Sequence, residues 1–153
     1  MDASLRTLIL GDGDFSFGLS YSRRYKSIRL TATSFDPHEE LLSKYPTAQD
    51  NVSSLKAAGA RVLHGVDATN LAPHFGSLQE ASNSCNLESF DTIIFNNPHI
   101  GVEDLHRHRF LLAHFFAEAR EHLVRVRMFA TALSVYAGKS GLWAFPVTIV
   151  SLH

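Results

Sequence analysis

The sequence of 153 residues has little of several features that would assign it to a common class of protein. Its single cysteine, Cys85, excludes an internal disulfide framework and indicates a reducing compartment. The chain has 14 Lys and Arg against 15 Asp and Glu, so it lacks the net positive charge that would indicate a nucleic-acid partner. No apolar run reaches membrane-spanning length, since Pro146 interrupts the one near the C-terminus, and the start lacks the apolar core of a signal peptide. We therefore expect an intracellular protein without a membrane partner.

What is present is an alternation of short apolar runs with longer segments of helical period. This alternation predicts an α/β domain with a mostly parallel sheet, covered by helices as a Rossmann-like three-layer sandwich. We expect one domain over residues 1–153. The predicted strands cover 6–10, 29–35, 60–65, 90–98 and 125–137, and the predicted helices cover 15–25, 39–58 with a break at Pro46, and 105–123. Residues 76–89 are small and polar, which predicts a surface loop.

An open parallel sheet binds its ligand beyond the carboxyl ends of its strands, where the strand order reverses. That rule selects the residues that follow each predicted strand. They are Gly11–Ser16, Asp36, Asp67 and Asn96–His99.

The stretch "LILGDGDFSF" places two glycines and two acids directly after the first strand. Gly11 and Gly13 allow close approach of a ligand to the backbone. The phosphate-binding G-K-[ST] motif is absent, and Ser16 breaks the G-x-G-x-x-G fingerprint of dinucleotide-binding folds. Asp12 and Asp14 would also repel a phosphate. The turn therefore favours a cationic, phosphate-free nucleoside such as S-adenosylmethionine, and disfavours an NAD-dependent oxidoreductase.

Two further acids follow the second and third strands. Asp36 lies 25 positions after Gly11, close to the roughly 20-residue spacing of the ribose-binding acid in dinucleotide folds. Asp67 is placed to accept from the adenine amino group. Each acid has a local alternative: helix capping for Asp12 and Asp14, a turn for Asp36 with Pro37, and an Asx turn before Thr69 for Asp67. Their occurrence at successive strand ends favours the ligand hypothesis.

Six segments occur in an order that resembles a known family. They are "LILGDGDFSF", "TATSFD", "EELLSKY", "VLHGVDAT", "FDTIIFNNPHIG" and "FFAEAREHL". Together they resemble the large-subunit rRNA uridine-N3 methyltransferase-like domain, which is also found in ferredoxin-fold anticodon-binding-domain-containing proteins. The resemblance covers residues 5–123. It implies a class I methyltransferase that uses S-adenosylmethionine on rRNA or another structured RNA, in the nucleolus or nucleus if the rRNA role holds and otherwise in the cytoplasm.

The resemblance also implies roles for individual residues. The cofactor loop of the family matches Gly11, Asp12, Gly13, Asp14, Phe15 and Ser16. Its "NFPHxG" element matches Asn96, Pro98, His99 and Gly101, which would hold the target base for methyl transfer. His99 would accept the uridine N3 proton or orient the base, with a loop-fixing role as the alternative.

The sequence departs from the family at two places. Asn97 stands where an aromatic residue is usual, and residues 124–153 lack the family's "E-x-H-V-T" strand, so we expect a domain truncated at its C-terminus. Both departures support a catalytically impaired RNA- or protein-binding module as the alternative function. The cluster at 106–109, His-Arg-His-Arg, predicts either contacts to RNA phosphates or a solvated helix start. The spacing of the histidines matches no zinc site, so we expect no metal.

Overall fold

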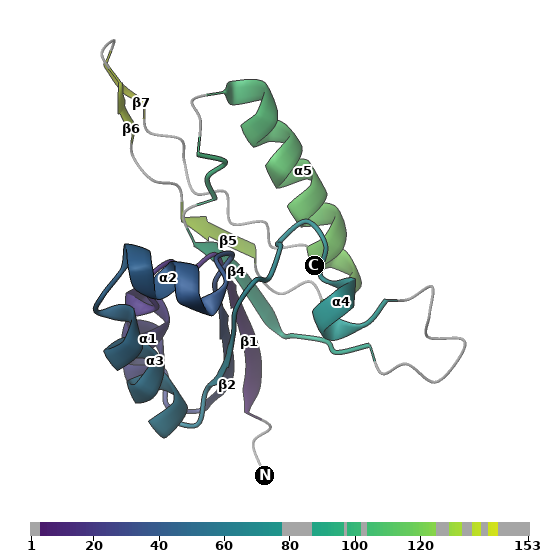
Figure 1. Cartoon of the computed structure of the whole chain (residues 1–153). Coiled ribbons are helices and arrows are strands. Elements are labelled where there is room, and N and C mark those ends of the chain that lie inside the picture. The colour runs from purple at the N-terminus through teal and green to yellow at the C-terminus, as the bar shows by residue number, and fades with distance from the viewer. Residues whose placement is uncertain are drawn as a thin grey trace.

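The computed structural model describes residues 4–77, 87–96, 98–101 and 104–124, and the backbone of 129–132, 136–138 and 141–143. A five-stranded parallel sheet has the order β3-β2-β1-β4-β5. Figure 1 shows α1, α2 and α3 on one face of this sheet and α4 and α5 on the other. The strands are β1 (Leu5–Leu10), β2 (Ile28–Thr33), β3 (Arg61–Leu63), β4 (Thr92–Asn96), β5 (Phe129–Ala132), and the hairpin strands β6 (Tyr136–Gly138) and β7 (Gly141–Trp143). The helices are α1 (Ser16–Arg24), α2 (His38–Lys44), α3 (Ala48–Ala57), α4 (Ala72–Phe75) and α5 (Leu105–Glu121).

The three-layer α/β prediction is confirmed. The helix break at Pro46 separates α2 from α3, and the long helix α5 begins at the predicted residue. The strand predicted over 60–65 is shorter, because the chain leaves the ladder after Leu63. The strand predicted over 125–137 contains β5 and the start of the separate strand β6. The short helix α4 and strand β7 were not predicted, because segments of three or four residues carry too little periodicity. Cys85 lies outside the described residues.

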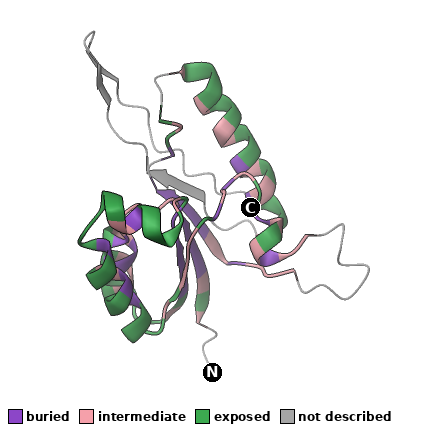
Figure 2. Cartoon of the chain, in the orientation of Figure 1, coloured by how far each residue is buried: buried purple, intermediate pink, exposed green. Residues whose placement is uncertain are grey.

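Side chains alternate across the central strands, as the pleat requires. Ile9 and Ile94 pack with Leu30 toward α1 and α3, and Leu8 and Ile93 pack toward α4 and α5. Both faces of β1 are therefore buried, which explains why its sequence is nearly continuously apolar. Figure 2 shows the buried sheet between helices whose outer faces are exposed.

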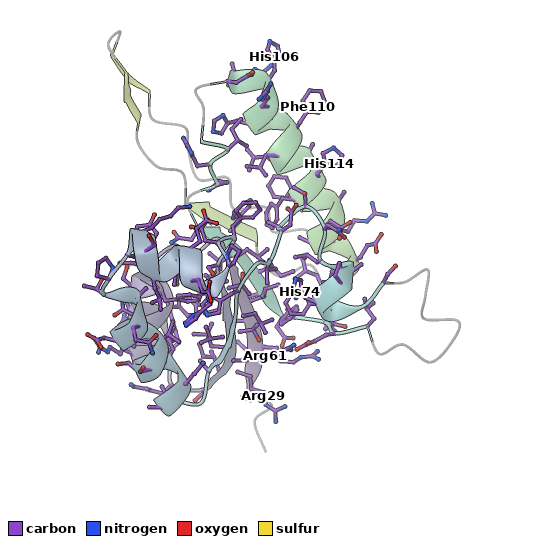
Figure 3. The ribbon with its side chains drawn as sticks, viewed as in Figure 1. Arg29, Arg61, His74, His106, Phe110 and His114 are labelled. Atoms are coloured by element: carbon purple, nitrogen blue, oxygen red, sulfur yellow. The ribbon has the colours of Figure 1, made fainter. Side chains whose placement is uncertain are left out.

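The two edges of the sheet are chemically different. Arg29 and Arg61 mark the amino ends of β2 and β3 (Figure 3). A hollow of about 380 Å³ at that edge is lined by Ser4, Leu5, Arg6, Arg29 and Asp91. The glycine turn and Asn96 lie at the opposite, carboxyl edge, where a parallel sheet places its ligand.

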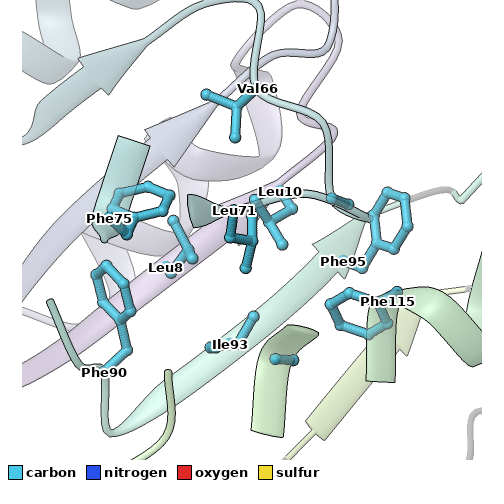
Figure 4. Packing of buried hydrophobic residues seen from close by; sticks show 11 residues of the cluster. Leu8, Leu10, Val66, Leu71, Phe75, Phe90, Ile93, Phe95 and Phe115 are labelled. Atoms are coloured by element: carbon cyan, nitrogen blue, oxygen red, sulfur yellow. The ribbon is translucent and has the colours of Figure 1, made fainter. Parts of the chain in front are cut away.

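Aromatic side chains hold α4 and α5 against the sheet (Figure 4). The ring of Phe95 on β4 lies 5.0 Å from that of Phe115 on α5, and Phe75 on α4 lies 5.3 Å from Phe90. All four are nearly or fully buried. Since burial of such a side chain contributes about 1.5–3 kcal/mol, these contacts fix the end of β4 on which Asn96 stands.

Candidate functional site

The strand order reverses between β1 and β4, so the site lies between the loops that follow these two strands. The loop after β1 is joined to β2 on its other side, since the amide of Asp12 donates to the carbonyl of Thr33 at 2.9 Å. The three segments at Gly11–Ser16, Asp36 and Asn96–His99 therefore lie on neighbouring strands, as the sequence predicts.

Asp12 points into the protein. Its side chain is 1% exposed, and Oδ2 accepts a hydrogen bond from the amide of Gly18 in the first turn of α1 at 2.6 Å. Burial raises the pKa of this carboxyl to about 6. Hydrogen bonds from the amides of Gly18 and Phe17 and from the side chain of Asn96 act in the opposite direction, because they stabilise the charged form. The capping alternative thus describes Asp12 in this structure, and the carboxylate also connects α1 with Asn96.

The raised pKa of Asp12 predicts a pH-dependent stability. The folded state holds this proton up to about pH 6, whereas an unfolded chain loses it near 3.8, so the folded state binds more protons in between. The free energy of unfolding should therefore fall as the pH rises from about 4 to about 6, by roughly 1–3 kcal/mol, and the contribution should level off above that range. Chemical denaturation at a series of pH values measures this slope.

The matched variant is Asp12→Asn, which keeps a carbonyl acceptor for the Gly18 amide but cannot ionise. Its unfolding free energy should lack the part of the decline that Asp12 causes. Asp50→Asn changes an exposed carboxylate on α3 and should keep the wild-type slope. An Asp12→Asn variant with the full wild-type slope would assign the slope to another group.

The turn that enters α1 is strained. Phe15 is fully buried and adopts the left-handed conformation, with φ 63°, which a side chain with a β-carbon rarely takes. Asp14 supports the turn, because its Oδ1 accepts from the amide of Ser16 at 3.0 Å and its carbonyl accepts from Asn51 at 2.9 Å. A strained residue held by its surroundings at a sheet edge is typical of functional loops.

The two glycines of the turn approach other elements closely. A β-carbon on Gly11 would lie 2.8 Å from a ring carbon of Phe95 and 3.0 Å from the carbonyl oxygen of Asn96. Gly13 faces the ring of Tyr45, whose hydroxyl would be 3.6 Å from an added β-carbon. Glycine at position 11 therefore lets β4 close against the turn, whereas a β-carbon at position 13 would make only ordinary contacts with Tyr45.

Asp36 lies at the carboxyl edge with a cation beside it. Its Oδ1 accepts from Lys44 Nζ at 2.9 Å, and the same Nζ lies 2.6 Å from Glu40. These bonds to Glu40 and Asp36 raise the pKa of Lys44. The preceding residue, Phe35, is 67% exposed, so an aromatic face stands in water next to the predicted ribose acid.

Asp67 follows β3 by four residues and forms a local turn. Its Oδ1 accepts from the amide and the hydroxyl of Thr69, at 2.8 and 2.7 Å. The Asx-turn alternative therefore describes this oxygen. The segment before Asp67 runs beside the Asp36 loop, because the amide of Gly65 donates to the carbonyl of Asp36 at 3.3 Å.

His64 belongs to the same edge, although the sequence placed it inside a strand. Its Nδ1 lies 3.0 Å from the hydroxyl of Ser34, and its ring meets those of Phe15 and His38 edge-on, at 5.4 and 4.8 Å. Partial burial lowers the pKa of His64, and the nearby His38 and Lys56 lower it further. The sequence could have indicated His64 as a residue of this edge through its position directly after a short strand.

Asn96 and Pro98 are buried at the exit of β4, and His99 is exposed. The Nδ1 atom of His99 accepts from the amide of Gly101 at 2.7 Å, and its ring lies 5.4 Å from that of His108 on α5. The loop therefore leads from the sheet edge to the start of α5. Asn97 lies outside the described residues.

Two further histidines, His108 on α5 and His122 just after it, bond to backbone carbonyl groups and not to each other. His108 Nδ1 lies 2.8 Å from the carbonyl of Asp104, and His122 is buried with Nδ1 2.9 Å from the carbonyl of Glu88. Over the described ranges, no group of three or more His, Cys, Asp or Glu side chains is placed to hold a metal ion. No helix in the same ranges is long and apolar enough to cross a membrane.

Two curated proteins share this sequence over most of its length. "Heavy metal-associated isoprenylated plant protein 41" of Arabidopsis thaliana is 37% identical over 117 residues, covering 71% of this chain and 21% of the plant protein. Human "Ferredoxin-fold anticodon-binding domain-containing protein 1" is 37% identical over 123 residues, covering 79% of this chain and 18% of the human protein. The chain thus spans about a fifth of each of these relatives.

Solved methyltransferases share the fold. A putative sarcosine dimethylglycine methyltransferase from Galdieria sulphuraria superposes with a TM-score of 0.53 at 14% identity, over 84% of this chain and 38% of the other. The O-methyltransferase of a multienzyme from Brevibacillus brevis, solved with S-adenosyl-L-homocysteine, gives 0.51 at 9% identity, over 83% and 34%. The model of the BMT5-like rRNA (uridine-N3-)-methyltransferase family matches residues 8–146, a range that holds the glycine turn, the acids after β2 and β3, and the Asn96 loop. The sheet order, the switch-point site and this match together show that the chain belongs to the BMT5-like methyltransferase family.

Proposed function

We propose that the chain transfers a methyl group from S-adenosylmethionine to N3 of a uridine in rRNA or another structured RNA. The observation that carries this proposal is the buried amide of Asn96, held beside the Asp12 carboxylate at the switch point of the sheet. The family model supports the reaction. The glycine turn and the acids at the carboxyl edge would hold a nucleoside beside Asn96, and the exposed His99 follows it in the chain.

The cofactor fits the acceptors along the carboxyl edge. Asp36 would accept the ribose hydroxyls, and the exposed ring of Phe35 beside it offers a face to the adenine. Gly11, Gly13, Asp14 and Ser16 of the turn would hold the methionine end, since Asp12 and Phe15 are buried. Asp67 would accept from the adenine amino group through the oxygen that Thr69 does not use. Bound there, S-adenosylmethionine supplies the methyl group. The related O-methyltransferase fold solved with the demethylated cofactor is consistent with this assignment.

The carboxylate of Asp12 determines how Asn96 would meet the base. An ionised carboxylate only accepts hydrogen bonds, so the Asn96 amide must turn its Nδ2 toward Asp12. The amide oxygen then points elsewhere and can accept a bond from the N3–H of uridine, which aligns N3 for transfer. In this arrangement Asp12 orients Asn96 rather than touching the cofactor, and it does so above about pH 6, where it is charged.

His99 is better placed to orient the base than to deprotonate it. Because its Nδ1 accepts from the Gly101 amide, a neutral imidazole carries its proton on Nε2. An Nε2–H can donate to a uridine carbonyl oxygen next to N3, which stabilises the anion that uridine forms when its N3 proton passes to solvent water. The methyl group is then transferred to the deprotonated N3. Pro98, buried between Asn96 and His99, fixes the course of the loop.

Asp36→Asn should weaken S-adenosylmethionine binding about tenfold or more, because hydrogen bonds to a charged acceptor contribute about 1.5–3 kcal/mol. Isothermal titration measures the affinity. Glu40→Gln is the matched control, since it removes the other carboxylate from Lys44 and leaves Asp36 in place. Equal losses in the two variants would show that Lys44 pairing, and not a ribose contact, sets the affinity.

The proposed reaction is tested by incubating the full chain with deproteinised rRNA and S-adenosylmethionine bearing a labelled methyl group, followed by nucleoside analysis. Labelled 3-methyluridine is the expected product, and titration with NAD should give no binding. A folded chain that binds RNA but transfers no methyl group would support the alternative, a non-catalytic RNA-binding module. If the rRNA role holds, the protein acts in the nucleolus or nucleus.

A further inference from the structure

The outward face of α5 carries side chains that the proposed reaction does not use. His106, Phe110 and His114 are spaced by four residues, which places them on one face of a helix. Figure 3 shows all three projecting from α5 on the same side, away from the sheet. Together with Arg109, they form what we call the α5 row. Phe110 is 66% exposed, so its ring is available to stack on a partner.

The charge of the α5 row is of one sign. The stretch from Leu105 to His114 contains no acidic residue, and the acids of α5, Glu118 and Glu121, come in its last turns. Glu118 is engaged elsewhere, because its Oε2 accepts from the amide of Leu71 at 3.0 Å. Among the described residues, no carboxylate forms an ion pair with Arg109, whereas Arg107 lies 3.5 Å from Asp104. The row therefore suits an anionic partner.

The position of the row connects it with the Asn96–His99 loop. The rings of His99 and His108 lie 5.4 Å apart, so α5 starts next to the exposed residue of that loop. From His106 to His114 the helix rises ~12 Å, at 1.5 Å per residue. His108 lies on the opposite side of α5 from Phe110, because two residues turn a helix by about 200°, and Arg109 lies between them. A strand that delivers a base to Asn96 would therefore pass around the start of α5, a helix ~10–12 Å wide, and meet Arg109 before Phe110.

We propose that the α5 row binds single-stranded RNA flanking the target nucleotide, with an unpaired base stacked on Phe110 and a phosphate on Arg109. Aromatic rings beside cationic groups are how proteins hold unpaired RNA. A protein partner fits less well, because Phe110 and the half-exposed Leu105 are the large exposed apolar side chains of α5, too few for the core of a protein interface. The inference rests on the proposed function, since it takes RNA as the substrate.

The test measures fluorescence anisotropy of a labelled single-stranded RNA oligonucleotide of mixed sequence with the full chain and its variants, at several salt concentrations. Phe110→Ala should weaken binding about tenfold with an unchanged salt dependence, because it removes stacking and no charge. Arg109→Gln should reduce the slope of log affinity against log salt by about 0.7, the value for one phosphate contact on a single strand. Tyr25→Ala, which removes a half-exposed aromatic ring at the end of α1, is the matched control and should change neither quantity.

Three results would overturn the inference. Phe110→Ala could bind RNA with wild-type affinity, Tyr25→Ala could lose as much RNA affinity as Phe110→Ala, or the unmodified chain could bind no RNA. Titration with S-adenosylmethionine and the methyl-transfer assay, run on the same preparations, separate it from the proposed function. A chain that binds RNA through Phe110 but transfers no methyl group contradicts the proposed function alone. A chain that methylates RNA and binds it equally well without Phe110 contradicts the α5 row alone.

Discussion

Replacing Asn96 with alanine should lower the rate of methyl transfer about 100-fold or more while leaving S-adenosylmethionine binding nearly unchanged. The variant lacks the amide that would bond to the base, so the base would no longer be held in place. Displacement of a reacting group by about 1 Å costs on the order of 10²-fold in rate. The proposed cofactor site lies mainly along β1 and β2, so the affinity for the cofactor should be retained. Single-turnover transfer to RNA and calorimetric titration of the cofactor measure the two quantities separately.

The Asn96→Ala variant also tests the pairing with Asp12. Without the amide, one of the bonds that lower the pKa of Asp12 is gone, so the stability decline with pH should extend to a higher pH than in the wild type. Asn70→Ala is the matched control, because it removes an exposed amide from the loop after β3. Methyl transfer at the wild-type rate by Asn96→Ala would remove this residue from the mechanism.

Gly11→Ala should reduce the free energy of unfolding by about 2–5 kcal/mol and abolish cofactor binding. The backbone there has φ 67°, where an L side chain costs about 1–2 kcal/mol. The new β-carbon would also meet Phe95 at 2.8 Å and the Asn96 carbonyl at 3.0 Å, and such overpacking costs about 1–3 kcal/mol. The variant would thus push β4, with Asn96, away from the turn.

Gly59→Ala separates the cost of the backbone conformation from the cost of the steric contact. Gly59 has φ 84°, but an added β-carbon there would meet nothing within 4 Å. This control should show only the backbone cost, and it should bind the cofactor like the wild type. Chemical denaturation gives both stabilities, and equal losses at Gly11 and Gly59 would contradict a close contact between the turn and β4.

Several features of the fold and site follow from local sequence. The β1 run "LRTLIL" is apolar because both of its faces are buried, so its pattern is readable without a structure. Pro46 cannot stand in a helix interior, so it separates α2 from α3. Asp104 caps α5 by accepting from the amide of Arg107 three residues later. Parallel strands also end at one edge, which placed Gly11, Asp36 and Asn96 together.

Other features depend on groups that are distant in the sequence. The sequence shows Asp12 as an acid at a turn, and only its burial on α1 next to Asn96, 84 positions later, makes it an orienting group with a raised pKa. Lys44, at the end of α2, pairs with Asp36, which precedes this helix. The spacing of residues in the sequence does not show whether a carboxylate will bond to a side chain of the protein or to a ligand, because either one can donate to its oxygens.

The sequence by itself determined the order of strands and helices, the edge at which the site lies and the family, because periodicity, turn residues and motif order are local properties of the chain. Only the tertiary structure decided which side chains point inward, that His64 and Phe35 stand at the site, and that Phe110 is left in water on α5. The physical reason is that burial and hydrogen bonding between β1, β4 and α1 arise from packing of distant segments, which no local pattern records.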